Sequence, residues 1–318
     1  MIWVTWRQHR AQLLVTGGLL AALGLLLLGS AVEARVYLAE HAPPGCPGSA
    51  PACWDLAAAL DARYQVIYSI FGWMPLLAPA LIGAFWGAPL LGREYERGTH
   101  RLAWTQQVSV ARWLGVKLAM LGALAAAGGL LLSAMVGLWR RALLREDLFG
   151  NIGVFNMVGV VPAAWWLYAF LLGTAAGALL RRTLPAMALV VAGMAVTVFA
   201  LFSLSDHYAE PVRAVLRDTT VLSDPDARLV RGAWLDPAGR ELAGPPTGVC
   251  PRRPDAGRSE AGQRAYERCL FAAGYRYAVY YHPPTRFWRF QWTEAAILGA
   301  ASLALAGVTV HRTLRHRV

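Results

Sequence analysis

Six apolar runs, separated by polar intervals, set the pattern of this 318-residue chain. A helix needs about 20 consecutive apolar residues to cross the hydrocarbon core of a bilayer. We therefore predict an all-α polytopic membrane protein, one transmembrane domain over residues 1–318. Its transmembrane helices are expected at residues 13–32, 68–91, 118–139, 158–180, 184–205 and 292–310.

The first run has a rival interpretation as a cleaved signal peptide. It is longer than the usual cleaved core, and it begins with aromatic rather than simply basic residues, which favours an uncleaved helix. Residues 1–12 contain Trp3, Trp6, Arg7 and Arg10, and tryptophan favours the boundary between membrane and water. We expect a separate interfacial helix there.

Arginine counting orients the chain. An even number of spans places both termini on one side. That side has twelve basic residues in its short flanks and the other has five, the latter being Arg35, Arg63, Arg140, Arg141 and Arg145. Because short cytoplasmic loops carry the excess of basic residues, we predict a cytoplasmic-membrane protein with both termini in the cytoplasm. Residues 206–291 then form a large extracellular loop, whose aromatic and basic end, 275–292, is expected at the lipid headgroups.

Composition supports the membrane assignment. The chain is 57% hydrophobic and only 15% charged, with a mean hydropathy of +0.41. The net charge of +11 does not indicate nucleic acid, because the arginines lie at the ends of apolar runs and in one long loop. With 29 arginines and one lysine among its basic residues, the sequence also has the composition of a GC-rich bacterial genome.

Several kinds of chemistry have no motif in the sequence. The only lysine, Lys117, is not in a phosphate-binding Gly-Lys-Ser/Thr sequence, and HExxH, GxSxG and CxxC are absent. We predict no catalytic, cofactor-binding or metal-binding residues. Ion-coupled transporters carry ionisable groups at membrane depth, whereas only Glu294 enters a predicted span here, and we expect it to pair with Arg289.

The polar interval 93–117 has a helical pattern of its own. Gly98 is expected to end the second transmembrane helix, because glycine accepts the left-handed conformation found at helix ends. Thr99 begins a short predicted helix that extends to Gln107, and Ser109 is the next candidate helix cap. The interval is either a short docking helix or a solvated connector.

The pattern resembles the permease subunits of type-2 ATP-binding-cassette (ABC) exporters. The amphipathic start, the six spans, the Glu-rich exit with Gly-Thr, and the lysine before the third span carry this resemblance. It implies that residues 93–117 hold a coupling helix that contacts a separate ATPase. The residues assigned to coupling by this resemblance are Arg93, Glu94, Glu96, Arg97, Gly98, Thr99, Arg101, Trp104 and Lys117.

The resemblance also implies the partners and the activity. The partners are an ABC ATPase that binds ATP and magnesium itself, a second permease that is identical or different, and membrane lipid. The expected cargo is hydrophobic or amphipathic. One alternative is a non-transporting membrane sensor or assembly protein with an extracellular ligand-binding loop. A membrane enzyme comes third, because its only candidate residues are scattered: Asp206, His207, His282 and Glu294.

The chain has four cysteines, and the predicted topology places all of them outside the cell, where oxidation is favoured. We expect Cys46 to pair with Cys53 and Cys250 with Cys269, because each pair is close in sequence. Four cysteines allow three connectivities, so the spacing alone does not choose among them.

The topology predicts how the chain reacts with a membrane-impermeant thiol reagent in intact cells. A single cysteine at Gln106 or at the C-terminus should be shielded, whereas one near Ala238 should react. Labelling of Gln106→Cys from outside would contradict the predicted orientation.

Overall fold

The computed structural model describes residues 2–44, 46, 51–98, 109–143, 148–216, 226–250 and 260–315. It divides into two compact units. The larger unit comprises Met1–Glu146, Ile152–Ser203 and Arg289–Val318, and the smaller comprises Asp147–Asn151 and Leu204–Trp288.

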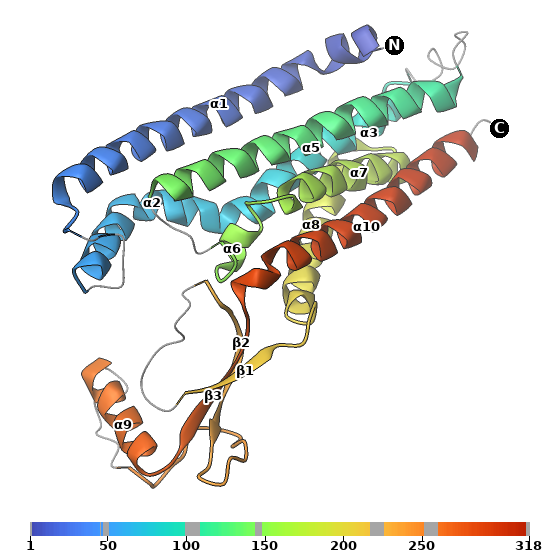
Figure 1. The fold of residues 1–318 in the computed structure, drawn as a ribbon. Coiled ribbons are helices and arrows are strands. Elements are labelled where there is room, and N and C mark those ends of the chain that lie inside the picture. The colour runs from blue at the N-terminus through green and yellow to red at the C-terminus, as the bar shows by residue number, and fades with distance from the viewer. Residues whose placement is uncertain are drawn as a thin grey trace. The chain divides into compact units, whose positions relative to one another are not determined.

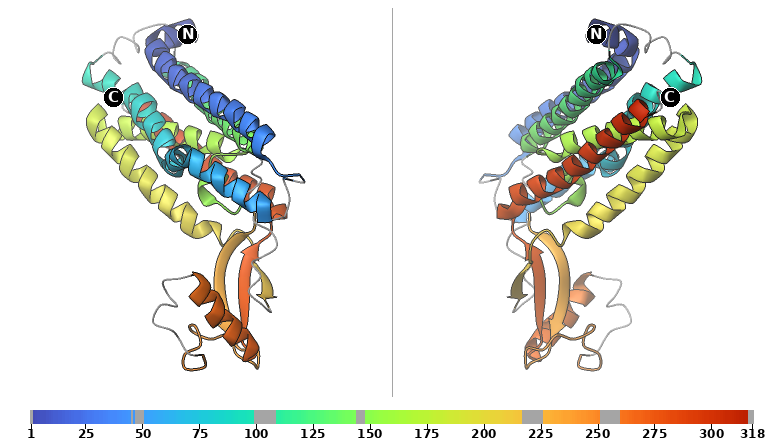
Figure 2. Two further views of the ribbon diagram at one scale, coloured as in Figure 1. Left: turned by 90° about the vertical axis from the view of Figure 1, so that its left-hand side faces the viewer. Right: turned by 90° about the vertical axis from the view of Figure 1, so that its right-hand side faces the viewer.

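Long helices build the larger unit (Figure 1). In the parts of the chain that the structure describes, six of them are long and apolar enough to cross a membrane, as predicted. The elements are α1 (Ile2–His41), α2 (Pro51–Ile82), the π-helical η1 (Gly83–Gly87), α3 (Ala88–Glu96), α5 (Val110–Ala142), α6 (Ile152–Phe155), α7 (Val161–Leu180), α8 (Thr183–Ser205) and α10 (Phe287–Arg315). The N-terminal end of α1 and the C-terminal end of α10 lie at the same end of this unit (Figures 1 and 2).

Several helices extend beyond the predicted spans. The prediction of a separate interfacial helix at residues 1–12 is wrong, since α1 is one continuous helix of 40 residues. No glycine or proline lies at the junction of residues 12 and 13, so nothing interrupts the backbone hydrogen bonds there. Helices α5 and α10 likewise begin before residues 118 and 292. Hydropathy marks the apolar part of a helix and not the ends of its hydrogen bonding.

The second candidate span is interrupted between α2 and α3 by the π-helical turn η1. Pro89 has no N–H, so it cannot donate the helical hydrogen bond to the carbonyl of Phe85. The side chain of Gln12 supplies the missing donor, with Nε2 2.8 Å from Phe85 O. Trp86 Nε1 donates to Thr16 Oγ1 at 3.1 Å. Two side-chain hydrogen bonds therefore join α1 to the irregular turn.

Glycines let this turn and α3 pass α7 backbone to backbone. A Cβ atom added to Gly87 would lie 2.8 Å from the Cα of Gly173, and one added to Gly177 would lie 2.6 Å from Ala88 O. Both distances are shorter than real Cβ contacts. The small-residue spacing at Gly83/Gly87 and Gly173/Gly177 thus lets the two helices pack closely.

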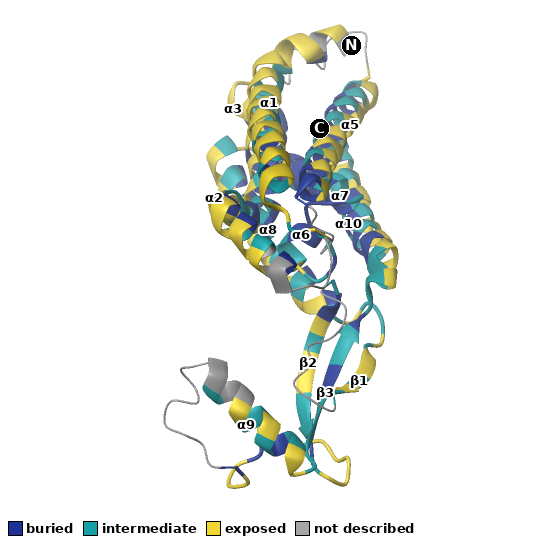
Figure 3. Cartoon of the chain, turned by 60° about the vertical axis from the view of Figure 1, so that its left-hand side comes forward, coloured by how far each residue is buried: buried dark blue, intermediate teal, exposed yellow. Residues whose placement is uncertain are grey.

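Helix α7 lies at the centre of the larger unit. In the most apolar part of α7, 67% of the residues are buried. The corresponding share for α1, which lies at the edge of the unit, is 6% (Figure 3). Trp165 and Ala169 of α7 pack against Val190 and Met194 of α8 and Leu298 of α10. The turn between α7 and α8 is short, and it makes these two helices antiparallel neighbours.

The smaller unit corrects the all-α prediction, because residues 206–291 contain a sheet and a helix rather than only a loop. The strands β1 (Val212–Leu216), β2 (Arg228–Leu235) and β3 (Arg276–His282) form an antiparallel sheet in the order β1-β3-β2. Strand β3 is the stretch RYAVYYH, which was predicted to lie at the headgroups. Aromatic and β-branched residues favour a strand, so the composition of this stretch is that of a strand as well as of a headgroup segment, and its place at the headgroups stays a prediction.

Two disulfides close local loops. Cys250 bonds to Cys269 of helix α9 (Glu260–Ala272) in the smaller unit, and Cys46 bonds to Cys53 at the start of α2 in the larger one. These are the pairings expected from sequence. Trp234 of β2 also contacts Phe271 and Tyr277, so α9 is fixed to the sheet by aromatic packing as well.

The glycine contacts predict different effects on thermal stability for two substitutions of glycine by alanine. Gly173→Ala should lower the thermal midpoint of the detergent-purified protein, because overpacking typically costs about 1–3 kcal/mol. Gly72→Ala is the matched control, since its Cβ would meet nothing within 4 Å. It should leave the midpoint unchanged or raise it, because alanine favours helix over glycine by up to about 1 kcal/mol. Equal midpoints for the two variants would contradict the described packing.

Candidate functional site

The candidate site is the end of α3, where the chain leaves the second candidate span. The structure places Arg93, Glu94 and Glu96 in the last turns of α3 and Arg97 at its C-cap. Among the other residues assigned to coupling, Thr99, Arg101 and Trp104 lie outside the described residues, as does the predicted helix from Thr99 to Gln107.

Helix α3 ends as the sequence predicted. The backbone N–H of Arg97 donates to Arg93 O, and Gly98 has a φ of +68°, in the left-handed region that glycine accepts without strain. The chain resumes at Ser109, whose side chain accepts a hydrogen bond from Arg112 N at the start of α5. Both boundaries of the polar interval are thus fixed by local capping interactions.

Glu94 and Lys117 form an ion pair between α3 and α5. Lys117 Nζ lies 2.6 Å from Glu94 Oε1 and 4.2 Å from the centre of the Trp113 ring. The Lys117 side chain is 3% exposed, and that of Glu94 is 20% exposed. A buried ammonium is costly without a carboxylate beside it, so this pair holds the two helices in one arrangement.

Glu96 binds the start of α8. Its two carboxylate oxygens accept hydrogen bonds from Thr183 N at 2.9 Å and from Thr183 Oγ1 at 2.8 Å. The first N–H groups of a helix have no partner within the helix, and the helix dipole makes that end favourable for an anion. Glu96 therefore acts as a capping group supplied by another helix.

Apolar and aromatic contacts surround these two polar links. Leu91 of α3, Leu114 of α5 and Ala178 of α7 form a small buried cluster. Arg181, in the turn before α8, lies over the ring of Tyr95, with its guanidinium carbon 5.6 Å from the ring centre. The end of α3 is consequently held by three neighbouring helices at once.

The ionisable groups at the end of α3 serve two different purposes. The carboxylates bond to Lys117 or to a helix end, and no group of three His, Cys, Asp or Glu that could hold a metal ion occurs in the described ranges. Arg93, Arg97 and Arg112 are exposed beside the polar interval. A force applied there would reach α5 and α8 through short, direct bonds.

A comparison with protein families decides the identity. The model of the family described as ABC-2 membrane transporter related matches residues 17–204, more than half of the chain. The chain belongs to this family. It is an ABC-2 type permease subunit, a multi-pass membrane protein with a transporter role, and its family implies an ABC ATPase subunit as partner. No curated protein and no solved structure matches it.

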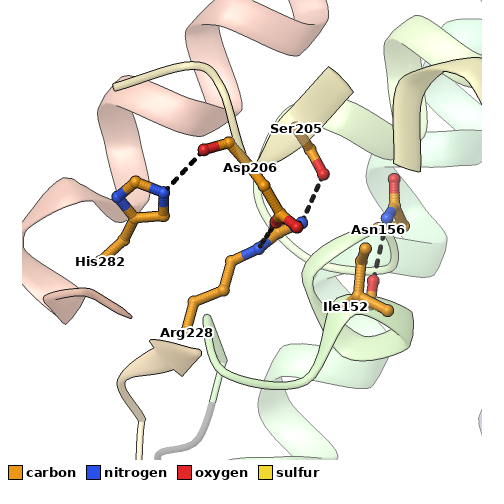
Figure 4. A network of polar contacts seen from close by, with 6 residues as sticks. All are labelled: Ile152, Asn156, Ser205, Asp206, Arg228 and His282. Atoms are coloured by element: carbon orange, nitrogen blue, oxygen red, sulfur yellow. Dashed lines mark hydrogen bonds and ion pairs between the residues drawn. The ribbon is translucent and has the colours of Figure 1, made fainter. Parts of the chain in front are cut away.

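In the smaller unit of the permease, the structure brings Asp206 and His282 together, two of the residues considered for an enzyme. Arg228 Nη2 lies 3.2 Å from Asp206 Oδ1, and Arg228 also donates to Ser205 Oγ (Figure 4). His282 Nε2 lies 3.1 Å from the backbone oxygen of Asp206, not from its carboxylate. This network links the chain after α8 to the ends of β2 and β3.

The state of His282 argues against an acid-base role. Arg286 Nη1 lies 3.0 Å from Nδ1 and can only donate, so Nδ1 accepts and Nε2 carries the proton. Burial, together with Arg286 and Arg228, lowers the pKa of His282. Both ring nitrogens of this neutral imidazole are therefore engaged in structural hydrogen bonds.

In the larger unit of the permease, Glu294 has a partner that the sequence did not indicate. Trp165 Nε1 donates to Glu294 Oε1 at 3.0 Å and to Asn156 Oδ1 at 3.1 Å. Nearby, Gln291 Oε1 accepts from the N–H groups of Val160 and Val161 at the start of α7. Asn156 Nδ2 also donates to Ile152 O (Figure 4). These bonds tie α10 to α6 and α7. The carboxylate of Glu294 thus bonds to Trp165, in place of the expected pairing with Arg289, whose side chain is exposed.

The burial of Lys117 predicts a large effect of removing it. Lys117→Met should lower the stability of the permease by up to about 3–5 kcal/mol, because Glu94 loses its ion-pair partner in a partly buried position. Adding Glu94→Gln to the same chain should recover part of the loss. The measurement is the thermal midpoint in detergent.

Arg63→Met is the matched control for Lys117→Met. Arg63 pairs with Glu33, but both side chains are about half exposed, at 48% and 50%. Such exposed pairs contribute at most about 1 kcal/mol. If Lys117→Met and Arg63→Met shift the midpoint equally, the Glu94–Lys117 pair does not hold α3 to α5.

Proposed function

We propose that this permease is the membrane half of an exporter, and that its ATPase partner docks on residues 93–117. The observation that carries the proposal is the double attachment of α3, through Glu94 to Lys117 and through Glu96 to Thr183. A surface that receives force from a partner needs rigid links to the helices it moves, and these two links provide them.

The same links give the proposed path of coupling. When the ATPase closes on ATP, it displaces the loop, and α3 carries the start of α8 and the adjoining end of α5 with it. The π-helical turn η1 lies between α3 and α2, and π-helical turns often mark functional sites within helices. We propose η1 as the point where α3 pivots against the remainder of the second span.

The proposal assigns no nucleotide chemistry to this chain. ATP and magnesium are bound by the partner, and a second permease, identical or different, completes the transporter. The cargo is proposed to be hydrophobic or amphipathic, because leucine, valine and phenylalanine supply much of the exposed surface of the spans. The same exposed residues also contact the lipid of the bilayer.

The alternative is a non-transporting sensor or assembly protein. The folded, disulfide-closed smaller unit favours it, because a sheet with an attached helix offers more binding surface than a plain connector would. Co-purification and ATPase activity without movement of any cargo would support this alternative over the exporter.

Docking and coupling are tested by different substitutions in the purified complex of permease and ATPase. Trp104→Ala should weaken assembly by roughly 2 kcal/mol or more, about a 30-fold rise in Kd, since tryptophan anchors dominate contact energies. Glu96→Ala should leave assembly intact but reduce cargo moved per ATP hydrolysed, because α8 loses its cap from α3. Affinity, ATPase rate and export in proteoliposomes are the readouts.

Glu33→Ala serves as the control for loss of a carboxylate, because Glu33 lies on α1 in an exposed pair. It should alter neither assembly nor export. Unchanged assembly and export in both Trp104→Ala and Glu96→Ala would leave residues 93–117 as a connector only and would contradict the proposal.

A further inference from the structure

A groove of about 360 Å³ lies between α1 and α5, entirely within the larger unit. Its most buried lining residues are Leu27, Trp139 and Ala142, which are 3%, 2% and 6% exposed. Leu28 and Leu138 line it as well and are mostly exposed, at 61% and 66%. The groove thus has an apolar floor and an apolar rim that faces away from the protein.

Two contacts set the spacing of the helices along the groove. Trp139 Nε1 donates to Ser30 Oγ at 2.8 Å, which satisfies the indole N–H. A Cβ added to Gly24 would lie 3.3 Å from Met135 Sδ, so α1 and α5 approach closely there. The walls of the groove are therefore held by direct contacts between the two helices.

Arg35 is the charged residue that lines this groove. It lies on the candidate span from Thr5 to His41, is exposed, and makes no ion pair or side-chain hydrogen bond with any described residue. Its neighbour Glu33 is taken by Arg63, whose guanidinium also lies 5.5 Å from the centre of the Tyr37 ring. A guanidinium thus lines an otherwise apolar groove, and no anion from the described part of the chain pairs with it.

We propose that the α1–α5 groove binds an anionic phospholipid of the surrounding bilayer. One acyl chain would lie along Leu27, Ala31 and Trp139, and the phosphodiester would pair with Arg35. Arginine presents parallel N–H donors that match two phosphate oxygens, which makes it suited to this headgroup. The bilayer supplies such an amphiphile at high local concentration, and the exposed rim opens the groove toward it. The site does not depend on the transport proposal.

The test is native mass spectrometry of the full permease in detergent, titrated separately with phosphatidylglycerol and phosphatidylcholine. Wild type should retain phosphatidylglycerol more tightly. Arg35→Gln should weaken phosphatidylglycerol binding at least about tenfold, because charge-assisted hydrogen bonds to the phosphodiester are lost. It should weaken phosphatidylcholine binding less, because the choline cation already offsets part of the attraction between that phosphodiester and Arg35. Ala31→Phe, which fills the groove, should weaken the binding of both lipids.

Arg141→Gln is the matched control. Arg141 is an exposed arginine near the end of α5 that does not line the groove. It should bind phosphatidylglycerol as wild type does. Three results would overturn the proposal: no loss in Arg35→Gln, an equal loss in Arg141→Gln, or equal affinity of wild type for the two lipids. Because Arg35 is exposed, its substitution tests binding without disturbing a packed core.

Discussion

The close passage of the second span along α7 is the constraint on which the rest of the larger unit depends. Gly83, Gly87, Gly173 and Gly177 leave no side chain between the two backbones, so the position of α3 is set by direct backbone contact. Only with α3 in this place do its carboxylates reach Lys117 on α5 and Thr183 on α8. Van der Waals packing of small residues is the main force between helices in lipid, where hydrophobic burial gives little advantage.

The pairing of charged side chains is a second constraint on the structure of this permease. A charged side chain in a membrane helix is expensive unless it finds a partner or reaches water. Lys117, the only lysine, is paired and buried, and Glu96 is paired with a helix end. Arg35 differs because it lines an apolar groove and has no ion-pair partner among the described residues. A lipid phosphate from the bilayer would supply that partner.

Much of the fold could be predicted from the sequence, because its signals are local. The six apolar runs, the stop at Gly98 and the cap at Ser109 each depend on a few neighbouring residues. The continuous helix α1 and the π-helical turn η1 could not be predicted from such local signals. Hydropathy falls where α1 leaves the apolar layer, although the hydrogen bonds of the helix continue. The π-helical turn η1 is stabilised by the side chain of Gln12, which lies on another helix far away in the sequence.

The candidate site was predicted only in part, because its contacts join residues that are far apart in the sequence. The resemblance assigns Glu94, Glu96 and Lys117 to coupling. Their spacing in the sequence does not predict that Glu94 pairs with Lys117 or that Glu96 binds Thr183. The link from Glu96 to Thr183 joins residues 87 positions apart, and the tie between Glu294 and Trp165 joins residues 129 apart. The sheet was missed because its strands are separated by long polar segments and resemble an aromatic membrane boundary.

The central claim is that α3 and the start of α8 move as one body against the remainder of the second span. Pulsed electron paramagnetic resonance distances between spin labels at exposed positions test it most directly, in the reconstituted complex with and without ATP. The account predicts a constant distance between labels at Arg97 and Leu184 and a changed distance between labels at Arg97 and Val66. A change between Arg97 and Leu184 as large as that between Arg97 and Val66 would contradict it.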